Sequence, residues 1–262
     1  MSIEVGHGRR ALTALTWPLG IALTSWSYLW RVTPIYRREV EGTTPDDLPP
    51  PLPDGVGQDD VQCLETGTGP LFHRVYTAVI RDADVDAAEL MARVQRDPGR
   101  MAPWGLARFR KVTGVEGRMQ VGDEFLIHMP GPWDGPVRAI EVTPTSFRFA
   151  TLAGHLEAGQ IEWRAWGERP AARTSMDHDR EDRARIVFRV SSWARPGDRL
   201  SAIAHDRLRM AKEVQLHMWS SVLERVVAAS GGSLDGALEI VTRRVDPALL
   251  DDRDETRSRV AG

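Results

Sequence analysis

The chain has 262 residues, of which 42% are hydrophobic and 27% are charged, which is ordinary for a soluble globular protein with a sizeable core. Lysine and arginine number 34 against 37 aspartates and glutamates, and the net charge of −3 gives no electrostatic support for a nucleic-acid partner. A single cysteine, Cys63, excludes an internal disulfide and any multi-cysteine zinc or iron–sulfur site, which suits a reducing cytoplasm.

The first 41 residues are an apolar or amphipathic segment whose pattern predicts a helix. Residues 11–30 carry no charge, have arginines on both sides, and repeat leucine and tryptophan at three- and four-residue steps. Three interpretations stay open for them: a helix docked on the domain or on a second copy as a homodimer, attachment to a membrane surface, and a transmembrane span. Residues 42–69 are rich in Pro, Gly and Asp and are expected to run as an extended linker.

Residues 70–232 carry the patterns of one α+β domain. A weakly alternating strand is predicted at residues 75–80, and apolar residues at helical spacing predict a helix over residues 86–96. Period-two alternation then predicts several paired strands, and their apolar faces include Phe147, Phe149, Trp163 and Phe188.

A long helix is predicted at the end of this domain. Residues 202–229 contain neither glycine nor proline, and Gly231 and Gly232 are expected to end the helix. Residues 233–262 are then expected to form a polar tail.

Seven residues are candidates for binding a ligand. His155 and Glu157 lie two apart between two predicted strands, where they either face one way as an acid/base pair or bond the amides of their own turn. Trp193 and Arg195 lie where a strand leads to the long helix and could grip a carboxylate or phosphate, the alternative being an Asp198 ion pair with Trp193 in the core. The other three come from strand and helix faces expected to meet: Trp163, Gln215 and Met218.

Three sequence blocks, TLAGHLEAGQIEW, SSWARPGDR and MPGPWDGPVR, resemble the family called domain of unknown function 1990, especially its actinobacterial members. That family is grouped with the START and pollen-allergen helix-grip superfamily. The resemblance therefore implies a curved antiparallel sheet wrapped around a long C-terminal helix, here with an N-terminal amphipathic helical extension. It implies no established activity.

The function expected first is binding of a small apolar or amphipathic molecule in a cavity between the sheet and the C-terminal helix. One alternative is a cyclase- or dehydratase-like enzyme that uses the same cavity. Another is a membrane-surface or interaction protein that acts through residues 11–30. No catalytic residue, cofactor or metal ligand is assigned, because no common nucleotide, protease or metal motif occurs in the sequence.

Overall fold

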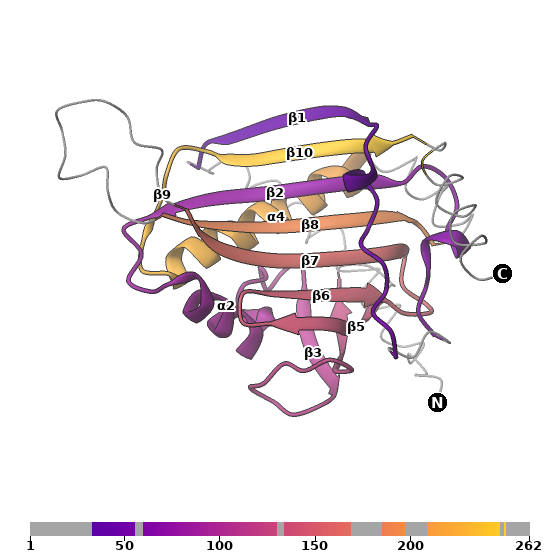
Figure 1. The fold of residues 1–262 in the computed structure, drawn as a ribbon, viewed down its shortest axis with the longest axis horizontal. Coiled ribbons are helices and arrows are strands. Elements are labelled where there is room, and N and C mark those ends of the chain that lie inside the picture. Colours follow the sequence, from indigo (N-terminus) through magenta and orange to yellow (C-terminus); the bar gives the residue numbers. More distant parts are fainter. Residues whose placement is uncertain are drawn as a thin grey trace.

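The structure is a computed structural model that describes residues 33–55, 60–129, 134–168, 185–197, 209–246 and 249, with residues 209–214 described by their backbone alone. Within these residues, ten strands form one curved sheet, and two α-helices pack against it (Figure 1). The helices are α2, Ala87–Arg96, and α4, Arg209–Ala229.

The strands follow the order β1-β10-β2-β8-β7-β6-β5-β4-β3 across the sheet, and the short β9 pairs with one end of β2. All pairings are antiparallel except that of β1 with β10. The sheet is therefore mixed, whereas a purely antiparallel one was expected. The strands are β1 Ile35–Gly42, β2 Phe72–Arg81, β3 Arg108–Thr113, β4 Glu124–His128, β5 Asp134–Thr143, β6 Ser146–Thr151, β7 Glu157–Glu168, β8 Arg185–Pro196, β9 Ser233–Leu234 and β10 Leu238–Val245.

Local sequence accounts for the ends of both helices. The side chain of Asp86 accepts a hydrogen bond from the amide of Glu89 at 2.8 Å and so caps α2, which ends just before Pro98. After α4, Gly231 takes a positive φ of 75°, the left-handed conformation that commonly stops a helix. The expected helix over residues 86–96 and the glycine stop after Ala229 are both present.

One face of the sheet packs against α4, and we call it the helix-side face. Its register places Trp163, Val190, Tyr76 and Ile240 side by side on β7, β8, β2 and β10, and all four are buried. The rings of Phe147, Phe149, Trp163 and Phe188 contact one another, and Trp163 also meets Trp219 of α4. The main core therefore lies between this face and the helices, as the alternation predicted.

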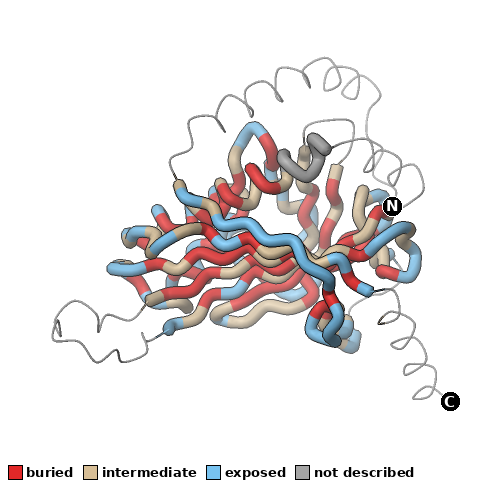
Figure 2. The backbone as a smooth tube through the Cα atoms, turned by 90° about the horizontal axis from the view of Figure 1, so that it is seen from above, coloured by how far each residue is buried: buried red, intermediate tan, exposed pale blue. Residues whose placement is uncertain are grey.

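The opposite, outer face carries a segment of chain that we call the strap, residues 43–55 and 60–69. The strap contains two short 3-10 turns, Pro45–Asp47 and Leu64–Thr66, and it crosses the strands of the sheet on the side away from α4 (Figure 1 and Figure 2). Its Leu64 is buried in a cluster with Leu71 and Trp193, and Leu52 and Val61 pack against Ile140 and Ala150. Enough leucine and valine lies among the prolines to give this segment a buried side.

Both ends of the chain depart from the sequence-based boundaries. Strand β1 takes up residues 35–41 of the expected helical segment and the first residue of the expected linker, and residues 238–245, expected in the polar tail, form β10. The edge strand β1 pairs with β10, and β10 pairs with β2 on its other side, so the backbone groups of these charged sequences are satisfied within the sheet. The predicted amphipathic helix at residues 11–30 lies outside the described residues. None of the described helices combines the length and hydrophobicity needed to cross a bilayer.

Candidate ligand-binding site

A buried arginine lies on the helix-side face of β2. Arg74 is in phase with Tyr76, Ala78 and Ile80, which belong to the main core, so its side chain leaves the strand on the same face. Only 5% of Arg74 is exposed. A buried guanidinium normally has several hydrogen-bond partners, so the contacts of Arg74 decide what this part of the interior can do.

Arg74 belongs to a cluster formed by three elements. Its Nη1 lies 4.0 Å from Oε1 of Glu157 at the start of β7, and Nε2 of Gln215 on α4 donates to the same oxygen at 3.1 Å. The Nη2 atom of Arg74 and the Oε1 atom of Gln215 are buried and have no hydrogen-bond partner among the residues that the structure describes. Two of the seven candidates, Glu157 and Gln215, therefore meet, although they are 58 residues apart.

Aromatic rings and small residues surround this cluster. Tyr76 is two residues from Arg74, and its ring lies 6.0 Å from that of Trp219 on α4. Burial raises the pKa of the Tyr76 phenol to about 12, so this group stays neutral and can donate a hydrogen bond. Gly159 and Ala194 pair across β7 and β8 in the neighbouring row and offer little side-chain bulk. The cluster is thus a polar spot beside an apolar wall.

His155 lies at the same end of the sheet but bonds to its own turn. Its Nδ1 accepts a hydrogen bond from the backbone amide of Glu157 at 2.9 Å. A Cβ atom added to Gly135 would lie only 2.9 Å from Nε2, so the ring packs closely over β5. Burial lowers the pKa of His155, which favours a neutral ring with its proton on Nε2. The hydrogen bonds of the described residues connect the His155 ring to the backbone amide of Glu157 and the Glu157 carboxylate to Gln215.

Trp163 and Met218 occupy different environments. Trp163 is 1% exposed and enclosed by aromatic rings, although its Nε1 has no hydrogen-bond partner among the residues described. Met218 is only half-buried, because the helix face that meets the core is centred on the buried Leu216, Leu223 and Val226. Val222 also belongs to the core, while Met218 lies at its margin.

Trp193 and Arg195 lie on the outer face. They are odd-numbered on β8, where the even-numbered Phe188 and Val190 face the helix, and a strand turns alternate side chains to opposite faces. Arg195 donates to the backbone oxygens of Leu64 and Gly69 in the strap, at 3.4 and 2.7 Å. These two candidates therefore hold the strap and do not line a space between sheet and α4.

The strap also brings a buried carboxylate to the outer face. Oδ1 of Asp47 lies 3.0 Å from Nδ1 of His73 and 3.3 Å from Nε of Arg243, and the His73 ring stacks on Trp193 with centroids 4.9 Å apart. Burial lowers the pKa of His73, and its hydrogen bond to Asp47 only partly offsets this. Burial by itself would raise the pKa of Asp47, but the hydrogen bonds from His73 and Thr44 hold it below its ordinary value. The arrangement is an Asp47–Arg243 ion pair beside a neutral imidazole.

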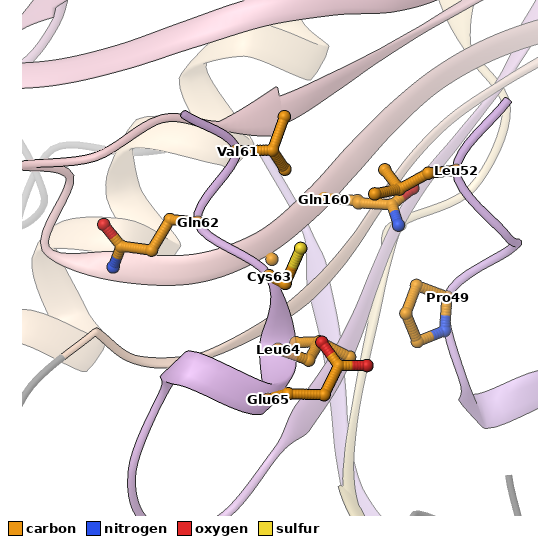
Figure 3. Close-up of a pocket in the computed structure, with 9 residues that line it drawn as sticks. Pro49, Leu52, Val61, Gln62, Cys63, Leu64, Glu65 and Gln160 are labelled. Carbon is orange, nitrogen blue, oxygen red and sulfur yellow. The ribbon is translucent and has the colours of Figure 1, made fainter. Parts of the chain in front are cut away.

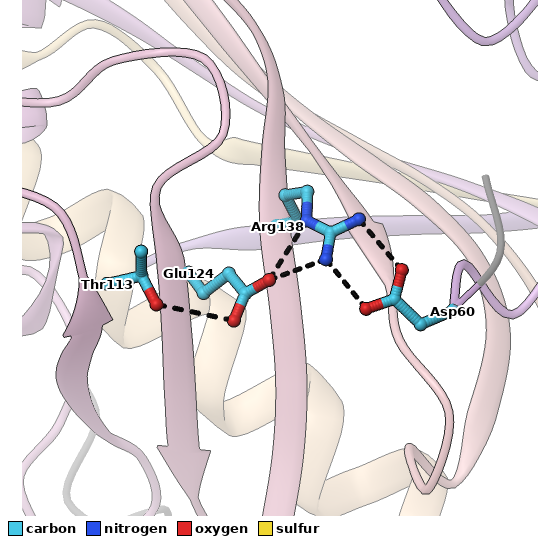
Figure 4. A network of polar contacts seen from close by, with 4 residues as sticks. All are labelled: Asp60, Thr113, Glu124 and Arg138. Atoms are coloured by element: carbon cyan, nitrogen blue, oxygen red, sulfur yellow. Dashed lines mark hydrogen bonds and ion pairs between the residues drawn. The ribbon is translucent and has the colours of Figure 1, made fainter. Parts of the chain in front are cut away.

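A second polar network fixes the strap near its middle, at Asp60 (Figure 4). Arg138 on β5 donates to both carboxylate oxygens of Asp60, at 3.0 and 2.7 Å, and its Nε donates to Glu124 on β4 at 3.0 Å. The Asp60 hydrogen bonds raise the pKa of Arg138, and the same bonds lower the pKa of Asp60. This network is structural. Among the described residues there is also no group of His, Cys, Asp and Glu that could hold a metal ion.

Two hollows lined by described residues lie away from the Arg74 cluster. One lies between strap and sheet, beside Cys63 and Gln160, and its volume of ≈ 30 Å³ suits a single water molecule (Figure 3). The other is an open hollow of ≈ 560 Å³ where α2 and α4 end, with Arg93, Arg96, Arg100 and Arg225 in its lining. Arg93 and Arg225 donate there to backbone oxygens across the two helix ends, at 2.8 and 2.7 Å.

Sequence reasoning missed Arg74, Tyr76 and Trp219. A signal for Arg74 was present, because an arginine in phase with Phe72, Tyr76 and Ala78 on a strand is a charge on the buried face. Its partners could not be read from the strand, since Glu157 and Gln215 reach it through the curvature of the sheet and the position of α4.

No protein-family model matches the chain, and no curated protein matches it either. The resemblance to domain of unknown function 1990 is therefore not confirmed. Solved structures that match include a major latex-like protein from Panax ginseng (10% identity, TM-score 0.35, covering 60% of this chain and 98% of that chain). A norcoclaurine synthase from Thalictrum also matches, with 10% identity and a TM-score of 0.36 over 62% of this chain and 98% of that chain. A protein from Arthrobacter aurescens matches with 15% identity and a TM-score of 0.35 over 60% of this chain and 86% of that chain. Similarity this low does not assign a ligand or a reaction.

Proposed function

We propose that the protein binds a small amphipathic molecule between the helix-side face of the sheet and α4. The observation that carries this proposal is the Arg74 cluster, in which buried polar atoms without partners lie beside an aromatic and aliphatic wall. Ligand sites in proteins are mostly apolar and contain a few polar groups that orient the ligand. A molecule with one polar end could satisfy the cluster while its apolar part contacts that wall.

Binding of Nile red, a neutral apolar dye, tests the proposal through its fluorescence. Ser192→Phe adds a ring on the helix-side face next to Arg74, with which Ser192 pairs, and should weaken dye binding at least about tenfold. Arg164→Phe adds the same ring to the exposed outer side of β7 and should leave dye binding unchanged.

Ala194→Val is a smaller change in the same region, for the case that Ser192→Phe does not fold, as judged by circular dichroism. The proposal fails if the wild-type protein does not take up the dye, or if folded variants on the helix-side face bind it as tightly as the wild type. Native mass spectrometry of the full chain purified from its own source adds an independent test, since a co-purifying small molecule would be seen directly.

A further inference from the structure

Two buried atoms, one a hydrogen-bond donor and one an acceptor, belong to side chains that contact the same carboxylate oxygen. Nη2 of Arg74 is a donor, Oε1 of Gln215 is an acceptor, and neither has a hydrogen-bond partner in the described part of the chain. Nη1 of Arg74 lies 4.0 Å from Oε1 of Glu157, and Nε2 of Gln215 donates to the same oxygen at 3.1 Å. The two atoms without partners therefore belong to side chains that meet at one oxygen, and a single small group that bonds both is the arrangement to test.

The orientation of the Gln215 amide follows from chemistry. An ionised carboxylate only accepts hydrogen bonds, so Glu157 requires the NH₂ end of the amide to face it. Rotating the amide by half a turn would put two oxygens against each other. The oxygen of Gln215 is therefore the end that remains available to a ligand.

The charges of Arg74 and Glu157 limit which ligands can bind between Arg74 and Gln215. Arg74 already has Glu157 as a counter-ion at 4.0 Å, so an anionic ligand would bring a second negative charge into a buried site that holds one of each sign. A cationic ligand would be repelled by the guanidinium of Arg74. A neutral group avoids both costs.

On the basis of the proposed function, we infer that the ligand carries a neutral head group with an adjacent acceptor and donor, such as a primary amide. Its carbonyl oxygen would accept from Nη2 of Arg74, and its N–H or O–H would donate to Oε1 of Gln215. The rest of the molecule would extend along the wall formed by Tyr76 and Trp219.

Displacement of Nile red by four ligands with the same ten-carbon scaffold tests this inference. They are decanamide, methyl decanoate, decanoate and decylamine, which differ in charge and in whether they can donate. Decanamide should bind about tenfold more tightly than methyl decanoate, which lacks the donor. It should also bind more tightly than either charged ligand.

Gln215→Leu removes the acceptor and should abolish the preference for the amide over the ester, and Gln215→Met serves if the leucine variant does not fold. Gln160→Leu is the matched control, because Gln160 is also buried and its Oε1 also lacks a partner, but it lies on the outer face. It should keep the preference. Equal binding of all four ligands, or tightest binding of decanoate, would overturn the inference and leave the proposed function intact. Failure of the wild-type protein to take up Nile red would contradict the proposed function itself.

Discussion

The two faces of the sheet satisfy their buried charges by different means. On the outer face, Asp47 bonds His73 at 3.0 Å, and Arg195 donates to two backbone oxygens of the strap. On the helix-side face, the described residues offer Arg74 a counter-ion at 4.0 Å and leave its Nη2 without a hydrogen-bond partner. The comparison teaches that the strap supplies partners for the buried charges of the outer face, although Nε2 of His73 and Nε of Arg195 have none among the described residues, whereas the charge of Arg74 is met only at 4.0 Å by a carboxylate of the sheet itself.

The largest effect expected from this comparison is on the stability of the apolar part of the helix-side face. Trp163→Ala should lower the free energy of unfolding by about 3–5 kcal/mol, because the ring is enclosed by Phe147, Phe188 and Trp219 and its loss leaves a cavity. Equilibrium unfolding in urea measures the change.

Trp166→Ala is the matched control for that substitution. Trp166 lies on the outer side of the same strand, is half-buried, and has the guanidinium of Arg189 4.9 Å from its ring centroid. Its loss should cost only about 1–2 kcal/mol. Equal costs for the two tryptophans would contradict the assignment of faces on β7.

A medium effect is expected where the strap meets the outer face. Asp47→Ala removes the acceptor for His73 and the counter-ion of Arg243, and should lower the free energy of unfolding by about 1–3 kcal/mol. Limited proteolysis should then cut the strap faster. Asp46→Ala, at the exposed neighbouring position, is the control and should change neither the stability nor the cleavage rate. Unchanged cleavage in Asp47→Ala would show that this carboxylate does not hold the strap.

The smallest expected effect is a dependence of stability on pH. The pKa of His73 in the folded protein lies below its ordinary value of 6.5, so the unfolded chain binds a proton more readily. The contribution of neutral His73 to stability is therefore complete above pH 6.5 and is lost as the pH falls through the folded-state pKa. The pKa of His155 is lowered in the same direction.

Urea unfolding at a series of pH values below 6.5 measures this dependence. His73→Gln should reduce the slope of the unfolding free energy against pH, and adding His155→Gln should reduce it further. A slope that is the same in His73→Gln and wild type would show that His73 titrates alike in the folded and unfolded chains.

The alternation of apolar and polar residues predicted many of the strands, because it shows which face of a strand is buried. It placed Phe149, Trp163 and Phe188 on the face that meets the helix, and the structure confirms this. It could not identify β1, because the Arg-Arg-Glu run in this edge strand puts charge on both faces and its pairing partner lies near the other end of the chain.

The candidate site was predictable to a lesser degree. Glu157 and Gln215 were both singled out, and the structure brings them together. Trp193 and Arg195 were chosen for their chemistry and nearness to α4, whereas strand parity, already clear from Phe188 and Val190, assigns them to the outer face. The strap that bonds Arg195 could not be foreseen, since a proline-rich sequence does not show which surface it will cover.

The position of β10 has a consequence for the order of folding. This strand is the last of the described strands to be synthesised, yet it lies between β1 and β2, the first two. Those strands therefore cannot reach their final places in the sheet until nearly all of the described chain has left the ribosome. Contacts between such distant segments form late and at a high entropic cost, so closure of this edge is expected to be a slow step in folding. Until then, the backbone groups along one side of β2 lack their partners and are exposed to pairing with other chains.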